Sequence, residues 1–143
     1  MTNSIRGLKC SIDYFKLIHL LKFLTNKDWE FFAPWCLMDG INVITNVKGF
    51  LDDFSLFEGH NIWELELQCT PPKTEPFRIK TYQDFSRSLC LCYLLYFDCG
   101  YLEIYIKEKC DVEHLKRQLE KIGAQDLCII TDENDARTRF AVG

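Results

Sequence analysis

The sequence predicts a single α+β domain over residues 1–143, with a mixed, mostly antiparallel sheet and helices packed on it. Short apolar segments alternate at the two-residue period of strands, and two longer segments repeat at the period of helices. Turns that contain glycine and aspartate join several strands directly, which is typical of antiparallel pairs. The length and a hydrophobic fraction of 48% fit one soluble globular domain with its own core.

The chain begins with a strand and a helix. Residues 5–12 have the composition of a strand, and they end at Asp13, whose carboxylate can accept hydrogen bonds from the first turn of a helix. Apolar residues then recur at helical spacing as far as Leu24. We therefore expect a strand over 5–12 and a helix from Asp13 to about Leu24.

A hairpin follows the first helix. Residues 29–37 and 41–45 are apolar segments on either side of Asp39-Gly40, a dipeptide that favours a tight turn. Pro34 has no N–H to donate to a neighbouring strand, so it places the first strand of the hairpin at an edge or at a bulge.

The next strand is expected to be half exposed. Residues 63–69 alternate, and the apolar face would carry Trp63, Leu65, Leu67 and Cys69. The opposite face would present Glu64 and Glu66 to water. The preceding segment, residues 47–60, has helical spacing of its phenylalanines but remains ambiguous.

The second half of the chain is more regular. Thr81, with Asp84 three residues later, predicts the start of a short helix that runs through Arg87. Residues 89–97 show no polar alternation and predict a central strand covered on both faces. A strand over 101–107 would then turn four side chains outward: Tyr101, Glu103, Tyr105 and Lys107.

A helix and two strands close the predicted fold. Asp111 is expected to cap a helix that ends at Ile122, before Gly123. Residues 127–131 and 138–142 then predict two strands around an acidic turn.

The acidic turn combines charges of both signs: Asp132, Glu133, Asp135, Arg137 and Arg139. In a strand over 138–142 the two arginines would share one face. There they could pair with acids across the hairpin, or present two guanidinium groups to an anion. A charge-paired turn and a contact with a partner both remain open.

Acidic residues are concentrated between Asp28 and Glu66. This stretch holds eight acidic residues, one base (Lys48) and all three tryptophans, in a chain whose formal net charge is −4. Negative charge beside large aromatic side chains suits a surface that attracts and holds a basic partner. A solvated face above an ordinary aromatic core is the alternative. The acidity argues against binding of nucleic acid, which requires a basic surface.

The eight cysteines contain no C-x-x-C pair, so the sequence predicts no zinc site, and core packing explains them better. We expect no metal and no cofactor. The N-terminus lacks the features of a signal peptide, and the longest apolar run, residues 89–97, is too short to cross a bilayer. The expected location is the cytoplasm, where the cysteines stay reduced, with no membrane contact.

A family resemblance rests mainly on the segment Ile130-Thr131-Asp132-Glu133-Asn134-Asp135-Ala136-Arg137-Thr138-Arg139-Phe140. Two further segments fall in the same order: Arg6-Gly7-Leu8-Lys9-Cys10-Ser11-Ile12 and Thr81-Tyr82-Gln83-Asp84-Phe85. The chain resembles an uncharacterised family of small bacterial proteins, a domain of unknown function from mainly Gram-positive genomes. The resemblance implies a small cytosolic bacterial protein and carries over no catalytic residue.

The sequence contains no glycine-rich phosphate loop, nucleophile elbow or H-E-x-x-H motif, so we expect no enzyme. The expected function is that of a small acidic cytosolic binding protein, and more narrowly an immunity protein that neutralises a basic, nuclease-like toxin domain. A small-ligand-binding or regulatory domain, or an uncatalogued enzyme, is the alternative. The residues expected to contact a basic protein partner are Asp52, Asp53, Glu58, Glu64, Glu66, Tyr101, Tyr105, Asp132, Glu133, Asp135, Arg137 and Arg139.

Overall fold

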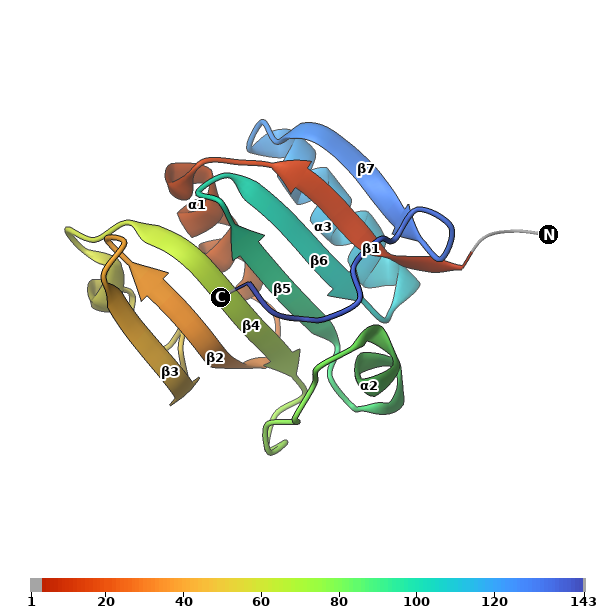
Figure 1. Cartoon of the computed structure of the whole chain (residues 1–143), viewed down its shortest axis with the longest axis horizontal. Helices are drawn as coiled ribbons and strands as arrows, with labels where there is room; N and C mark the ends of the chain where they lie inside the picture. The colour runs from red at the N-terminus through yellow and green to blue at the C-terminus, as the bar shows by residue number, and fades with distance from the viewer. Residues whose placement is uncertain (1–3, 143) are drawn as a thin grey trace.

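Seven strands form one antiparallel sheet in the computed structural model, which describes residues 4–142 (Figure 1). The elements in chain order are β1 (Ile5–Ser11), α1 (Tyr14–Leu24), β2 (Glu30–Met38), β3 (Asn42–Lys48), the 3-10 helix η1 (Phe54–Phe57), β4 (Ile62–Thr70), α2 (Tyr82–Arg87), β5 (Cys92–Phe97), β6 (Tyr101–Ile106), α3 (Lys109–Lys121) and β7 (Gln125–Thr131). The strand order is β3-β2-β4-β5-β6-β1-β7, and each neighbouring pair is antiparallel. The predicted α+β fold is confirmed.

The two faces of the sheet are covered differently (Figure 1). Helices α1 and α3 lie behind the sheet in this view, and we call that side the helix face. The opposite side, the front face, carries α2 and residues 132–142, which we call the C-terminal segment. Within residues 4–142, no helix is both long and apolar enough to cross a membrane.

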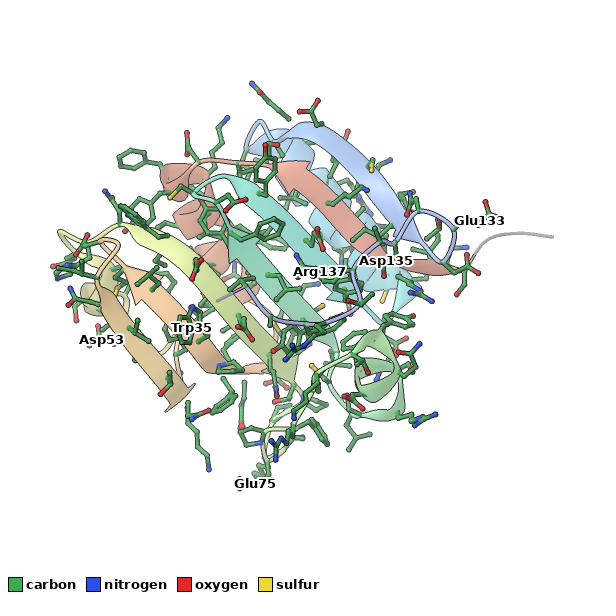
Figure 2. All side chains as sticks on the ribbon, viewed as in Figure 1. Trp35, Asp53, Glu75, Glu133, Asp135 and Arg137 are labelled. Atoms are coloured by element: carbon green, nitrogen blue, oxygen red, sulfur yellow. The ribbon has the colours of Figure 1, made fainter. Side chains whose placement is uncertain are left out.

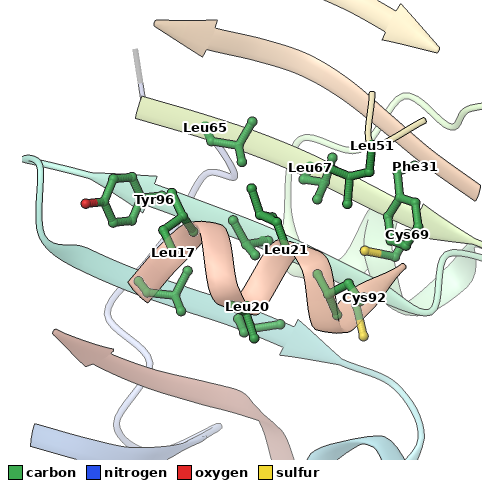
Figure 3. Close-up of a cluster of buried hydrophobic side chains, with 14 of the residues drawn as sticks. Leu17, Leu20, Leu21, Phe31, Leu51, Leu65, Leu67, Cys69, Cys92 and Tyr96 are labelled. Atoms are coloured by element: carbon green, nitrogen blue, oxygen red, sulfur yellow. The ribbon is translucent and has the colours of Figure 1, made fainter. Parts of the chain in front are cut away.

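The main core lies between α1, α3 and the helix face. Leu17, Leu20 and Leu21 of α1 are fully buried in this core, which also contains Leu65 and Leu67 of β4 (Figure 3). Burying one such side chain contributes about 1.5–3 kcal/mol, so this leucine cluster stabilises the position of α1 on the sheet. A second cluster on the front face surrounds Phe85, Tyr93, Tyr105 and Phe140.

Local signals placed several elements correctly. The carboxylate of Asp13 accepts a hydrogen bond of 2.9 Å from the backbone N–H of Lys16, at the start of α1. Asp39 and Gly40 have φ values of 55° and 74°, as the turn between β2 and β3 requires. Thr81 caps α2 by accepting from the N–H of Asp84.

Helix α3 begins before the predicted cap. Its N-cap is Glu108, which makes no capping hydrogen bond with its side chain. Asp111 instead lies buried in the first turn, with the Lys27 Nζ atom 3.5 Å from its Oδ1 atom. The prediction that Asp111 caps the helix was wrong because the helix begins earlier, and Lys27, three residues after the end of α1, is the partner of Asp111.

Two details of the first four strands differ from the sequence pattern. Pro34 lies in an interior strand, at an irregularity between the pairs that Phe32 and Trp35 make with β4. Of the two placements predicted for Pro34, the bulge is therefore confirmed and the edge strand is not. A second irregularity near Met38 breaks the alternation of β4. Trp63 is therefore 42% exposed. The prediction that it lies on the core face with Leu65 and Leu67 was wrong.

The predicted last strand is absent from the described part of the chain. Residues 138–142 are irregular and cross the front face, and the N–H of Phe140 donates a hydrogen bond of 2.8 Å to the carbonyl of Lys80. The ring of Phe140 is 3% exposed between α2 and the sheet. This backbone hydrogen bond and side-chain contacts, and not pairing with a strand, hold the segment in place.

Candidate functional site

Strand register brings polar and aromatic side chains together on the front face of β2, β4 and β5. Glu66 of β4 is paired with Trp35 of β2, and Gln68 is paired with Phe32 of β2 and with Tyr93 of β5. Because alternate residues of a strand face the same side, Glu66 and Gln68 project from one face.

A groove of about 480 Å³ opens on this part of the front face. It is lined by Phe32, Pro34, Asn46, Glu66, Gln68, Pro76, Phe77, Arg78, Ile79 and Tyr93. We call it the Glu66 groove. Six of these ten residues are apolar or aromatic, and Asn46, Glu66, Gln68 and Arg78 add polar or charged side chains, a combination found in ligand-binding concavities.

Glu66 is the acidic residue of this groove and is only 9% exposed. Its Oε1 atom accepts a hydrogen bond of 3.3 Å from the hydroxyl of Tyr93, and its Oε2 atom accepts one of 3.4 Å from the backbone N–H of Val142. Burial raises the pKa of Glu66 and outweighs these hydrogen bonds and the field of Arg137, which lower it. The carboxylate is thus largely removed from water and, within residues 4–142, forms no ion pair, although Arg78 lines the same groove.

Gln68 shapes the wall of the groove. Its Nε2 atom donates to the carbonyl of Phe77, and its Oε1 atom accepts from the N–H of the same residue. This double hydrogen bond holds Phe77, which follows Pro71, Pro72 and Pro76 in the chain, against β4. The side chain of Phe77 belongs to the front-face cluster, so the wall is both hydrogen-bonded and packed.

Glu64 lies beside Glu66, two residues earlier on β4. The indole Nε1 of Trp35 donates a hydrogen bond of 3.1 Å to the Oε1 atom of Glu64. The charge of Glu64 also contributes to raising the pKa of Glu66. Both carboxylates do share one face of the strand, as the alternation predicted. Of the two, Glu64 is partly exposed and Glu66 is buried. The expectation that Glu66 faces water was wrong because the C-terminal segment and Tyr93 cover its carboxylate.

The C-terminal segment is attached to the sheet by charged side chains. The Oδ2 atom of Asp135 lies 3.0 Å from the Nη1 atom of Arg6, and its Oδ1 atom accepts a hydrogen bond of 2.9 Å from the Tyr105 hydroxyl. Arg137 Nε donates to Glu103 Oε1 over 2.7 Å. These three predicted site residues, Asp135, Arg137 and Tyr105, therefore hold the segment in place.

Tyr105 was predicted to face outward but is fully buried. Its ring centre lies 4.3 Å from that of Phe140. It does project from the predicted face of β6, but α2 and the C-terminal segment cover that face. Tyr101, at the other end of the strand, remains 53% exposed and stacks on Phe97.

The remaining predicted contact residues do not form one surface with the Glu66 groove. Asp52, Asp53 and Glu58 are exposed on the segment around η1, and Asp53 caps this helix by accepting from the N–H of Ser55. Asp132, Glu133 and Arg139 are exposed on the C-terminal segment. Figure 2 shows Asp53 and Glu133 at opposite sides of the molecule. The acidic stretch of the sequence is thus divided between separate parts of the surface.

Five of the eight cysteines are buried: Cys10, Cys36, Cys69, Cys90 and Cys92. Burial raises the pKa of the Cys36 and Cys90 thiols to about 12, so both stay protonated and unreactive at neutral pH. The expectation of core packing is confirmed for these five and is wrong for the exposed Cys99, Cys110 and Cys128.

Sequence reasoning missed the groove residues Phe32, Asn46, Phe77 and Tyr93. The uniform apolar composition of residues 89–97 did indicate that Tyr93 would be covered. Asn46 has a φ of 55° opposite the bulge at Pro34, a backbone feature that the sequence pattern did not reveal.

Comparison with known proteins places the chain among proteins without an assigned activity. Residues 34–141 match the family described as "Protein of unknown function (DUF2691)". The chain is also 33% identical over 113 residues to the uncharacterized protein YncE of Bacillus subtilis (strain 168). The aligned region covers 67% of this chain and 74% of the relative. No solved structure is significantly similar to this chain. The matched region includes every residue that lines the Glu66 groove except Phe32, and nearly all of the C-terminal segment. The chain belongs to this uncharacterised bacterial family, DUF2691.

Proposed function

We propose that this protein binds a basic protein partner and that the Glu66 groove receives a lysine or arginine side chain of that partner. The observation that carries the proposal is the burial of Glu66. Its side chain is almost fully buried, although it lines a groove that is open to solvent. Within residues 4–142 no lysine or arginine forms an ion pair with it. An incoming cation would supply a charge-assisted hydrogen bond, which contributes about 1.5–3 kcal/mol.

The surroundings of Glu66 favour a long cationic side chain over a simple ion. Phe32, Pro34 and Phe77 line the groove with apolar surface, on which the methylene groups of lysine or arginine can pack. Trp35 and Glu64 lie next to Glu66 on the same face, and Glu64 adds negative potential at the site. The charged end and the apolar stem of such a side chain would each find a complementary surface.

The narrower proposal is an immunity protein that neutralises a basic, nuclease-like toxin domain in the cytoplasm. A net charge of −4 would steer a basic partner toward the protein and raise the rate of encounter. The anchored cation at Glu66 would then slow dissociation. A small cationic ligand is the second candidate, because a groove of about 480 Å³ has the volume of a small-molecule site.

Capture from a lysate of the native host tests the proposal. Immobilised wild-type protein, Glu66→Gln and Glu113→Gln would be compared at moderate salt, with retained proteins identified by mass spectrometry. Glu113 is exposed on α3, away from the groove, and Glu113→Gln makes the same charge change. We expect a basic protein to be retained by the wild type and by Glu113→Gln and to be lost with Glu66→Gln. Equal retention by all three, or retention of no basic protein by any, would contradict the proposal.

A further inference from the structure

A second groove lies on the opposite side of the molecule, where the end of α1 meets α3. It has a volume of about 410 Å³ and is lined by Phe23, Asn26, Lys27, His114, Arg117, Gln118 and Lys121. Both helices pack on the helix face of the sheet, so this groove is separate from the Glu66 groove (Figure 1). We call it the α1–α3 groove.

The α1–α3 groove is basic in a protein that is acidic overall. Its lining includes two lysines and an arginine but no carboxylate. On α3, His114, Arg117 and Lys121 follow one another at spacings of three and four residues, which places them on one face of the helix. The sequence therefore builds a cationic stripe on the side of α3 that meets the end of α1.

Lys27 is held in position at one end of this stripe. Its Nζ atom lies 3.5 Å from Asp111 Oδ1 and 3.0 Å from His114 Nδ1, and its side chain is only 20% exposed. Because an ammonium group can only donate, Nδ1 of His114 accepts, and the hydrogen of the neutral ring is on Nε2. His114 therefore retains one N–H donor for a ligand.

Arg117 and Lys121 carry the charge that is free to bind. Both side chains are exposed, and neither forms an ion pair within the described residues, whereas Lys27 is neutralised by Asp111. Asn26 and Gln118 add neutral amide donors to the lining. The free groups of the groove are thus mainly hydrogen-bond donors of positive or neutral charge, which is the chemistry that recognises a phosphate oxyanion.

We propose that the α1–α3 groove binds a small organic phosphate, with the phosphate group on Arg117 and Lys121 and the organic part on Phe23. The aromatic ring of Phe23 lines the same groove and offers the one large apolar surface in it. The volume exceeds what a bare phosphate ion fills, which leaves space for an organic group. The assignment does not depend on the function proposed for the Glu66 groove.

Titration of the full-length ¹⁵N-labelled protein followed by NMR tests this site. The probes are adenosine monophosphate, inorganic phosphate and adenosine, which separate the phosphate from the organic part. We expect adenosine monophosphate to shift the amide signals of residues that line the groove in a saturable way. Inorganic phosphate should act on the same residues more weakly, and adenosine should cause no saturable shift.

Matched variants locate the binding. Arg117→Gln combined with Lys121→Gln should weaken adenosine monophosphate binding about tenfold or more, because two charge-assisted contacts are lost. Lys109→Gln makes a similar change on an exposed lysine of the same helix outside the groove and should keep wild-type affinity. Circular dichroism would verify that each variant is folded.

Three results would overturn the assignment. One is the absence of saturable shifts with adenosine monophosphate, and another is unchanged affinity in the double variant. A third is equal affinity for adenosine and adenosine monophosphate, which would show that the cationic stripe does not recognise the phosphate group. Inorganic phosphate binding as tightly as adenosine monophosphate would overturn the role given to Phe23.

Discussion

Tyr93 of β5 donates a hydrogen bond of 3.3 Å to the carboxylate of Glu66 on the neighbouring strand β4. Burial and the adjacent carboxylate raise the pKa of Tyr93, so the phenol stays protonated and remains a donor. The pair lies on the front face, where the groove meets the C-terminal segment. The hydrogen bond therefore joins two residues that line the Glu66 groove, and Tyr93 also packs in the front-face cluster.

Replacing Tyr93 by phenylalanine should destabilise the protein by about 1–3 kcal/mol, because a buried carboxylate loses one of its two hydrogen bonds. Urea denaturation would measure the free energy of unfolding. Tyr101→Phe is the matched control, since that tyrosine is 53% exposed, and its effect should stay within about 0.5 kcal/mol. Equal effects of the two substitutions would contradict the role of the Tyr93 hydroxyl.

The raised pKa of Glu66 makes a directional prediction for pH dependence. The folded protein holds the Glu66 proton at pH values where the unfolded chain, with an ordinary pKa near 4.5, has released it. This contribution favours folding at low pH and is lost as pH rises from 4.5 through the folded pKa. The free energy of unfolding of Glu66→Gln minus that of the wild type should therefore increase with pH above 4.5. Denaturation of both proteins from pH 4 to 8 measures it, and a flat or falling difference would refute the raised pKa.

Asp135 should be required for the attachment of the C-terminal segment. Asp135→Ala leaves Arg6 and the buried Tyr105 hydroxyl without their partner, so we expect a loss of about 3 kcal/mol. Cleavage by trypsin after Arg137 or Arg139 should also become faster. The exposed Asp132 provides the control, and Asp132→Ala should change stability by less than about 0.5 kcal/mol. Comparable losses in both variants would mean that the ion pair between Arg6 and Asp135 does not hold the segment.

Gly7 allows close approach of β1 to β6. A Cβ atom at this position would clash with the carbonyl of Ile104, which belongs to the backbone and cannot move aside without disturbing the sheet. Gly7→Ala should therefore cost more than about 2 kcal/mol. Gly100→Ala, where a Cβ meets no atom closer than 3.8 Å, should be far milder when thermal unfolding of the two is compared. Similar unfolding temperatures would show that β1 can shift freely.

The sequence predicted the elements whose causes are local. The Asp13 cap and the Asp39-Gly40 turn depend on residues within a few positions of one another, and both are present. The C-terminal segment could not be predicted in this way. Its conformation depends on the contact between Asp135 and Arg6, which are 129 positions apart, and alternation alone suggested a strand.

The candidate site was predicted only in part for the same reason. Alternation along β4 correctly placed Glu64 and Glu66 on one face. Whether that face meets water is decided by Tyr93 and by Val142, which reaches Glu66 from the far end of the chain. Burial of Glu66 changes its expected role from a steering charge on the surface to an anchor inside a groove.

The kinetics of binding to the captured basic partner test this role most directly. Surface-binding measurements would compare wild-type protein with Glu66→Gln and Glu64→Lys across a range of salt concentrations. We predict that Glu66→Gln mainly raises the dissociation rate, since it removes a buried charge pair, whereas Glu64→Lys mainly slows association and flattens its salt dependence. Wild-type dissociation and association rates in both variants would contradict the assignment of the Glu66 groove as the binding site.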